Sequence, residues 1–325
     1  MIQELSGHTP VAAARFLELV TPALQRPGAL YLDATVGLGG HSFAVAERFP
    51  EARIIGLDRD PEAVERARAR LGDRAEIFHA PFTELGRILD GIGRSAADPT
   101  SGPEAPDAIL FDLGVSSMQL DQDRRGFAYS RDTALDMRMD GGQELTAAQI
   151  LATYSREELT RVFKSYGEER YAWRIAGRVV AARQQAPLER SGQLVDLIKQ
   201  SVPAASRRTG GNPAKRVFQA LRVEVNRELD QLEVALPQAV QRLRVGGRLV
   251  VMSYQSLEDT MVKRILTAAA TSSAPPGLPV EPESTKPVLK LLTRGAEPAS
   301  ELEQTENRRS APLRLRAAQK IRATS

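Results

Sequence analysis

Cysteine is absent from the 325-residue sequence, and histidine occurs only three times, as His8, His41 and His79. The missing cysteine excludes a disulfide framework, a cysteine-ligated zinc site, an iron–sulfur cluster and a catalytic thiol. Three histidines are too few for a histidine-rich metal centre, so we expect no metal. No apolar run reaches the roughly 18 residues of a membrane-spanning helix, and the first residues lack the features of a signal peptide. We therefore expect a cytoplasmic protein without a membrane contact.

The chain has the composition of a soluble globular protein, with 42% hydrophobic and 26% charged residues. Its 44 basic and 41 acidic residues leave a formal charge of +3, and the pI is about 9.2. This balance permits a nucleic-acid partner without requiring one. The length corresponds to two domains, or to one domain with a large insertion.

The first third of the chain alternates between short apolar runs and helical segments. Ala63, Ala67 and Leu71 recur at the spacing of one helix face. The apolar runs lie at residues 29–33, 53–58, 76–79 and 108–112. Strands that alternate with helices are typical of βαβ units, so this region predicts a parallel sheet.

The pattern changes after Asp112 to helical segments between residues 146 and 201, and Ser155 with Glu158 has the form of a capping box. The apolar spacing from Phe218 to Leu236 predicts one long helix. Strand patterns then return at residues 248–253, 288–292 and 312–316, of which the last two are expected to pair antiparallel.

This order predicts an α/β, Rossmann-like doubly wound sheet that an all-helical domain interrupts. We expect the sheet domain to comprise residues 1–125 and 212–325, and the helical domain residues 126–211. We expect the helical domain to recognise RNA.

A glycine-rich turn follows the first predicted strand. Its glycines, Gly37, Gly39 and Gly40, let the backbone pass close to a ligand. Asp58 ends the second strand 18 residues after Gly40, near the offset at which an acid meets ribose hydroxyls. The spacing is G-x-G-G and not the dinucleotide pattern G-x-G-x-x-G. Asp33, which ends the first strand, suits the positive charge of S-adenosylmethionine better than a pyrophosphate. A plain βα turn without a ligand is the alternative.

Two further strand ends carry candidate residues. Asp112 ends the fourth strand, where its carboxylate could accept a hydrogen bond from an exocyclic amine and make that nitrogen a better nucleophile. The alternative is that Asp112 only orients the cofactor or the loop. His41 lies inside the glycine turn, where we expect a cofactor contact. Phe82 follows the third strand and is expected either to pack on an adenine or to pack in the core.

Nine motifs occur in the order known from one family. They include DLGVSS at residues 112–117, LDMRMD at 135–140, YGEE at 166–169, FQALR at 218–222 and SLED at 256–259. The chain resembles the ribosomal RNA small subunit methyltransferase H (MraW) family from His8 to about Lys320. The resemblance implies a class I methyltransferase fold, S-adenosylmethionine as cofactor and methylation of the N4 amine of one cytidine in the decoding centre of 16S rRNA. It also implies cofactor contacts at the following positions: Gly39, Gly40, His41, Asp58, Phe82, Asp112 and Gln119.

The departures from the family lie on the side where RNA is expected. Gln255 and Asn212 stand where the family usually has histidine, which argues against an essential histidine base at either position. We expect substrate contacts at Arg216, Arg222, Asn226, Ser253, Tyr254 and Ser256. Tyr254 is either a stacking platform for a flipped base or a core residue. Further basic residues gather at Arg207, Arg208 and the C-terminus and predict phosphate contacts.

Other functions remain open at this point. A non-catalytic RNA-binding ribosome assembly factor could retain the same fold, although the intact turn with Asp58 and Asp112 counts against it. An NAD-dependent oxidoreductase lacks its dinucleotide pattern here. Amine methylation of DNA is a further alternative. The expected partner is 16S rRNA within the small ribosomal subunit, and the protein is expected to be a monomer or a homodimer.

Overall fold

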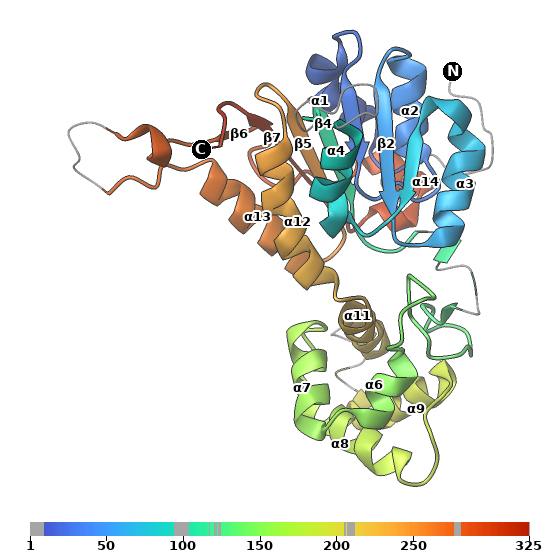
Figure 1. The fold of residues 1–325 in the computed structure, drawn as a ribbon. Coiled ribbons are helices and arrows are strands. Elements are labelled where there is room, and N and C mark those ends of the chain that lie inside the picture. The colour runs from blue at the N-terminus through green and yellow to red at the C-terminus, as the bar shows by residue number, and fades with distance from the viewer. Residues whose placement is uncertain are drawn as a thin grey trace. The chain divides into compact units, whose positions relative to one another are not determined.

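The computed structural model describes residues 10–93, 104–116, 118–119, 122, 125–204, 206, 212–275 and 281–324. It divides into two compact units, of which one comprises residues 1–114 and 230–325 and the other residues 115–229. We call them the sheet unit and the helical unit (Figure 1). The predicted residues His8, Arg207 and Arg208 lie outside the described part of the chain.

The sheet unit is built on one seven-stranded sheet in the order β3-β2-β1-β4-β5-β7-β6. Strands β1 to β5 run parallel, and β7 pairs antiparallel with both β5 and β6. The strand bounds are β1 Leu30–Asp33, β2 Arg53–Asp58, β3 Glu76–His79, β4 Ala108–Asp112, β5 Arg248–Ser253, β6 Leu289–Leu291 and β7 Arg314–Lys320. The predicted parallel sheet and the predicted antiparallel pair near the C-terminus are confirmed.

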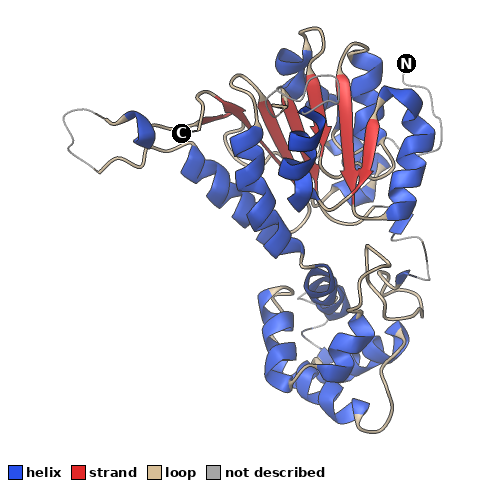
Figure 2. Cartoon of the chain, in the orientation of Figure 1, coloured by secondary structure: helices blue, strands red, loops and turns tan. Residues whose placement is uncertain are grey.

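Helices pack on both faces of this sheet (Figure 2). Because strand side chains alternate between faces, Leu30 and Leu32 contribute to the core under α4, α12 and α13, whereas Tyr31 contributes to the core under α1 and α2. The helix bounds are α1 Ala13–Leu24, α2 Gly40–Arg48, α3 Pro61–Leu71, α4 Leu85–Gly93, α12 Glu228–Arg242, α13 Ser256–Ala269 and α14 Glu301–Glu306. Burial on both faces explains why the parallel strands read as continuous apolar runs.

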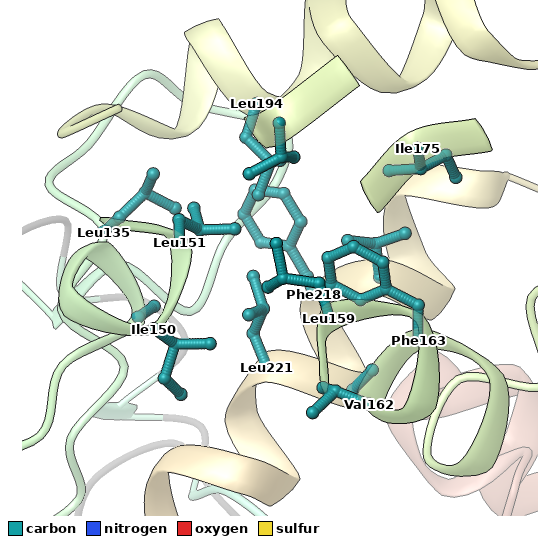
Figure 3. Packing of buried hydrophobic residues seen from close by; sticks show 14 of the residues in the cluster. Leu135, Ile150, Leu151, Leu159, Val162, Phe163, Ile175, Leu194, Phe218 and Leu221 are labelled. Carbon is teal, nitrogen blue, oxygen red and sulfur yellow. The ribbon is translucent and has the colours of Figure 1, made fainter. Parts of the chain in front are cut away.

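The helical unit has its own apolar core, which Figure 3 shows from close by. Its helices are α6 Ala147–Thr153, α7 Arg156–Ser165, α8 Ala172–Arg183, α9 Ser191–Ser201 and α11 Pro213–Asn226. The predicted capping box begins α7, because the Ser155 hydroxyl accepts from the Glu158 N–H while the Glu158 carboxylate accepts from the Ser155 N–H. None of the described helices is long and apolar enough to cross a membrane.

The expectation of one long helix from Phe218 to Leu236 is wrong. The chain forms α11 and α12 instead, because Arg227 adopts a left-handed conformation (φ 49°) and ends α11. The apolar spacing continues across the break, which is why periodicity alone did not reveal it. Phe218 and Leu221 belong to the core of the helical unit, whereas Leu232 and Leu236 belong to the core of the sheet unit.

The compact helical unit is longer than the expected segment of residues 126–211. At its end, α11 adds apolar side chains such as Val217 and Phe218 to the helical core. At its start, Val115 packs against the same core. Val115 and helix α11 therefore pack with the insertion, although the sequence on both sides of it reads as part of an α/β domain.

Candidate functional site

The glycine-rich turn connects β1 to α2. Gly37 and Gly39 have positive φ angles of 52° and 73°, which residues with a side chain rarely adopt. Gly39 also packs closely on α3, since a Cβ there would lie 3.2 Å from Leu71 Cδ1. The Gly37 N–H donates to Asp58 Oδ2 at 2.8 Å and joins the turn to the end of β2.

Asp58 therefore lies against the glycine turn. Its second oxygen, Oδ1, accepts the Asp60 N–H at 2.9 Å. Burial raises the pKa of Asp58 to about 6, although the two backbone N–H groups act in the opposite direction. The carboxylate is thus held in place by backbone donors, at the position where a ribose would be recognised in this fold.

Asp33 is buried within the protein and has several polar neighbours. Its Oδ2 accepts the Ser42 hydroxyl at 2.7 Å and the Tyr31 hydroxyl at 3.1 Å. Its Oδ1 accepts the Thr35 N–H at 3.3 Å. Burial raises the pKa of Asp33, and it raises the pKa of Tyr31 well above its usual range. Asp33 therefore ties β1 to α2, and only 1% of its surface is exposed.

Asp112 lies at the end of β4, between the side chains of Tyr254 and His41, which are distant from it in the sequence. The Tyr254 hydroxyl donates to Asp112 Oδ1 at 2.8 Å, and His41 Nδ1 lies 3.6 Å from Asp112 Oδ2. The Asp112 side chain keeps 26% exposure, whereas His41 keeps 6%. Asp112 is thus partly open to solvent, whereas His41 is buried. Burial raises the pKa of Asp112, although His41 and Tyr254 lower it.

The contact of His41 Nε2 determines which ring nitrogen of His41 faces Asp112. His41 Nε2 lies 2.9 Å from the Val11 carbonyl oxygen, which can only accept a hydrogen bond, so Nε2 carries a proton. Nδ1 is then the nitrogen that faces Asp112.

Phe82 lies in the 3₁₀ turn η2 (Phe82–Glu84), directly after the end of β3. Its half-buried ring packs edge to face on Phe111, with 5.6 Å between the ring centroids. Phe82 therefore packs against the core, which was one of its two expected roles, and part of its ring remains at the surface. His79 is exposed and bonds the Arg59 carbonyl through Nε2 at 3.0 Å.

Three predicted residues, Ser253, Tyr254 and Ser256, lie between the end of β5 and the start of α13. Tyr254 is half-buried, and its hydroxyl donates to Asp112. Burial raises the pKa of Tyr254 well above its usual range, and the Asp112 carboxylate raises it further. Ser253 is buried, and its Oγ has no hydrogen-bond partner within the described residues. Ser256 begins α13, and Gln255 just ahead of it donates to Glu258 at 2.9 Å.

The remaining predicted residues belong to the helical unit, where each makes contacts within that unit. Arg216 forms an ion pair with the fully buried Glu169 at 2.6 Å, and Arg222 binds both carboxylate oxygens of Glu228. Gln119 is buried, and its Oε1 accepts the Ser116 N–H at 3.0 Å.

Asn226 is fully buried in the helical unit. Its amide donates to the Met137 carbonyl at 2.8 Å and accepts the Met139 N–H at 2.9 Å. The structure gives Asn226 a role in holding residues 137–139, which lie within one of the recognised motifs.

The C-terminal basic residues are largely engaged as well. Arg314 and Arg316 both bind Asp259, and the buried Lys320 donates to the Gln241 carbonyl. The charge count of the sequence could not separate such internal pairs from cations that are available to a phosphate.

Sequence reasoning missed two contributions to the site. The Thr35 hydroxyl accepts the Asp112 N–H at 2.6 Å, and thereby links the glycine turn to β4. The Tyr254–Asp112 contact was also missed, although the expected pairing of the fourth and fifth strands would bring their ends together. The described residues include no group of three or more His, Asp or Glu side chains that could hold a metal ion.

Comparison with known proteins identifies the family. The chain matches the MraW methylase family over residues 5–321. It is 56% identical over 319 residues to the ribosomal RNA small subunit methyltransferase H of Parafrankia sp. (strain EAN1pec), which covers 97% of this chain and 95% of that protein. It is 53% identical over 320 residues to the protein of the same name from Streptomyces avermitilis, with 98% of each covered.

Among solved structures, an rRNA methylase from Streptococcus thermophilus aligns with 99% of this chain and 99% of its own, at 12% identity and a TM-score of 0.43. The assignment rests on the family match alone. The fold is that of a class I, S-adenosylmethionine-dependent methyltransferase. Within that class, the chain belongs to the MraW methylase family.

Proposed function

We propose that this protein methylates the N4 amine of one cytidine in the decoding centre of 16S rRNA, in the cytoplasm, with S-adenosylmethionine as methyl donor. The names of relatives at 53–56% identity support a small-subunit rRNA substrate. The motif resemblance supports the N4 amine of a cytidine. The observation that carries the proposal is the Asp112 carboxylate, partly exposed at the end of β4 and held by Tyr254.

The residues of the sheet unit fit S-adenosylmethionine in their chemistry. Asp58 offers a carboxylate to ribose hydroxyls, and Phe82 offers a half-buried ring to an adenine. Asp112, which is partly exposed, supplies negative charge that suits a sulfonium or an amino group, whereas Asp33 is buried and supports the turn through Ser42. Ser253 keeps a buried hydroxyl without a partner among the described residues, at the end of the strand next to β4. A neutral or anionic cofactor would use this set of donors and acceptors less well.

We assign the cofactor to the turn and the strand ends. Gly37, Gly39 and Gly40 would let it approach the backbone, since none of them carries a side chain. His41 would border it from the start of α2. Gln119, which the family resemblance adds to the cofactor contacts, belongs to the helical unit, and its assignment rests on that resemblance.

Bound S-adenosylmethionine supplies an electrophilic methyl group on its sulfonium sulfur. Asp112 would accept a hydrogen bond from the N4 amine and orient the nitrogen lone pair toward that methyl group. In the transfer the nitrogen would gain the methyl group through its lone pair, and the cofactor sulfur would keep the electrons of the C–S bond. The nitrogen then releases a proton, which Asp112 takes up at its free oxygen. Because burial raises its pKa, Asp112 is a better proton acceptor than an ordinary aspartate.

Tyr254 and His41 would act on Asp112 and not on the substrate. The Tyr254 hydroxyl fixes one carboxylate oxygen and so directs the other. His41 Nδ1 lies 3.6 Å from that other oxygen, and His41 lowers the pKa of Asp112. Tyr254 is therefore assigned as a positioning residue, in place of the stacking platform that the sequence left open.

The test uses 30S subunits from a strain that lacks its own enzyme. They are incubated with the protein and methyl-labelled S-adenosylmethionine, and the label is mapped by nuclease digestion and mass spectrometry. We expect label at N4 of one decoding-centre cytidine. Cofactor binding without label on 30S subunits would contradict the proposal and favour the non-catalytic assembly factor. Label on duplex DNA in competition would favour a DNA amine methyltransferase.

A further inference from the structure

Helix α8 has one face in the core of the helical unit and another in solvent. Ile175 points into that core in Figure 3, and Ala172, Ala176 and Val179 are buried with it. Trp173, Arg174 and Arg178 are exposed. Trp173 keeps 50% exposure, which makes it one of the most exposed large apolar side chains in the described chain. Trp173 thus lies on the solvent-facing side of α8 and does not belong to the helical core.

Trp173 is part of a stack with an arginine from the neighbouring helix. The Arg156 guanidinium lies 3.8 Å from the centre of the indole, and its Nη2 lies 3.4 Å from the Trp173 carbonyl oxygen. Such a cation–π stack fixes a flat, positively charged group beside the exposed indole.

A glycine in the middle of α8 makes room for this stack. A Cβ at Gly177 would lie 2.7 Å from Arg156 Nη2, so a larger residue would push the guanidinium away. Glycine is unfavourable inside a helix, which makes its presence here informative. Arg156 Nε is buried and has no hydrogen-bond partner within the described residues. Helix packing alone would not need an arginine at this position.

The charges of α8 are all of one sign. The helix contains Arg174, Arg178 and Arg183 and no carboxylate. Arg183 donates to the carbonyls of Leu151 and Tyr154 and is used within the unit. Arg174 and Arg178 form no ion pair within the described residues, and Arg178 contacts only the neutral Gln200, at 3.3 Å.

Several other arginines of the helical unit are matched by acids. Arg161 pairs with Glu224, Arg190 with Asp132 and Arg216 with the buried Glu169. Arg174 and Arg178, for which the described residues supply no acid, differ from these paired arginines. They are one helical turn apart and both follow the exposed Trp173 in sequence.

We propose that Arg156, Trp173, Arg174 and Arg178, which we call the outer α8 face, bind RNA. Arg174 and Arg178 would contact backbone phosphates. The exposed indole and the stacked guanidinium would contact the face of an unpaired base. An acidic protein would use the charges but not this stack, so RNA fits the surface better. The inference deepens the proposed function, because it assigns the RNA contact to particular residues of the helical unit.

The first test measures the methylation of 30S subunits by R174Q/R178Q. The control K263Q/K290Q removes two exposed lysines of the sheet unit and so loses the same charge. We expect R174Q/R178Q to raise KM for 30S subunits at least fivefold with kcat changed less than twofold. The slope of log KM against log salt concentration should be smaller by about 2 than in the wild type, because each lost phosphate contact reduces it by about 1. The control should change neither quantity by as much, and S-adenosylmethionine affinity should be unchanged in both.

A second test does not depend on methylation. Trp173 is the sole tryptophan of the chain, so its fluorescence reports on this surface directly. A short oligocytidylate should quench it in the wild type, and R174Q/R178Q should need at least fivefold more RNA for the same quenching. Quenching without methylation of 30S subunits would support the surface while the proposed function fails. Methylation with R174Q/R178Q equal to its control would overturn the surface alone. Ultraviolet cross-links from α8 to a ribosomal protein, with none to rRNA, would overturn the choice of RNA.

Discussion

At the scale of single residues, Asp112 is the group on which the proposed reaction depends. We expect D112N to lower kcat for 30S methylation by at least 100-fold, since an amide cannot accept the amine proton. S-adenosylmethionine affinity, measured by calorimetry, should change much less. The control D90N alters a carboxylate that pairs with Arg242 on the surface. Full turnover by D112N would remove Asp112 from the mechanism.

Tyr254 offers a finer test, because it acts through Asp112. Activity requires the ionised carboxylate, so kcat should fall as pH drops through the raised pKa of Asp112. The Tyr254 hydroxyl lowers that pKa, and its removal in Y254F should shift the acid limb of the pH profile to higher pH. We expect kcat at neutral pH to fall only several-fold. An unshifted acid limb would show that the hydrogen bond does not control Asp112.

Asp58 should make the stability of the free protein depend on pH. Its pKa of about 6 exceeds the usual 3.8, so the folded state holds this proton more tightly than the unfolded chain. The stabilisation is present below the ordinary pKa and is lost as pH rises through about 6. It amounts to about 3 kcal/mol at most.

Urea unfolding at several pH values would measure this effect. The wild type should lose stability between about pH 4 and pH 7, and D58N should not. D58N should also bind S-adenosylmethionine more weakly. The exposed Asp73, changed to asparagine, serves as the control. Parallel stability profiles of D58N and the wild type would argue that Asp58 is not perturbed.

At the scale of elements, α11 shows how a residue that looked like a ligand contact serves packing. Asn226 is the last residue of α11 and bridges to the backbone of Met137 and Met139. N226A would leave that buried N–H and carbonyl unpaired, at a cost of about 2 kcal/mol. We expect lower stability in urea and a largely unchanged KM for 30S subunits.

The exposed Gln185, changed to alanine, provides the control for N226A, and it should leave stability unchanged. A raised KM with unaltered stability would instead restore the substrate contact that the sequence predicted for Asn226.

Most elements were predictable, and the failures share a cause. Strands β1 to β5 carry apolar runs that end at acids or turns, and α7 carries its own capping box, so local chemistry marks their ends. The break at Arg227 has no such mark, because neither glycine nor proline stands there. A left-handed arginine is held by its surroundings, which local propensity does not describe.

At the scale of the whole molecule, the two units should respond to different ligands. The cofactor residues assigned around the glycine turn belong to the sheet unit, and the outer α8 face belongs to the helical unit. Hydrogen exchange with S-adenosylhomocysteine should therefore show protection at residues 33–42 and 58–60. Residues 147–201, which form most of the helical core, should exchange as in the free protein. Equal protection in both units would contradict this division.

The sequence by itself determined the fold class, the family motifs and the carboxylates that end β1, β2 and β4. It could do so because apolar periodicity, glycine turns and strand-end acids are local patterns. Tertiary structure alone decided which polar groups remain available. It paired Arg216 with Glu169, buried Asn226, directed Tyr254 to Asp112 and placed no acid of the described chain against the arginines of α8. The reason is physical: a charge or an amide is free or engaged only through neighbours that the chain brings to it on folding.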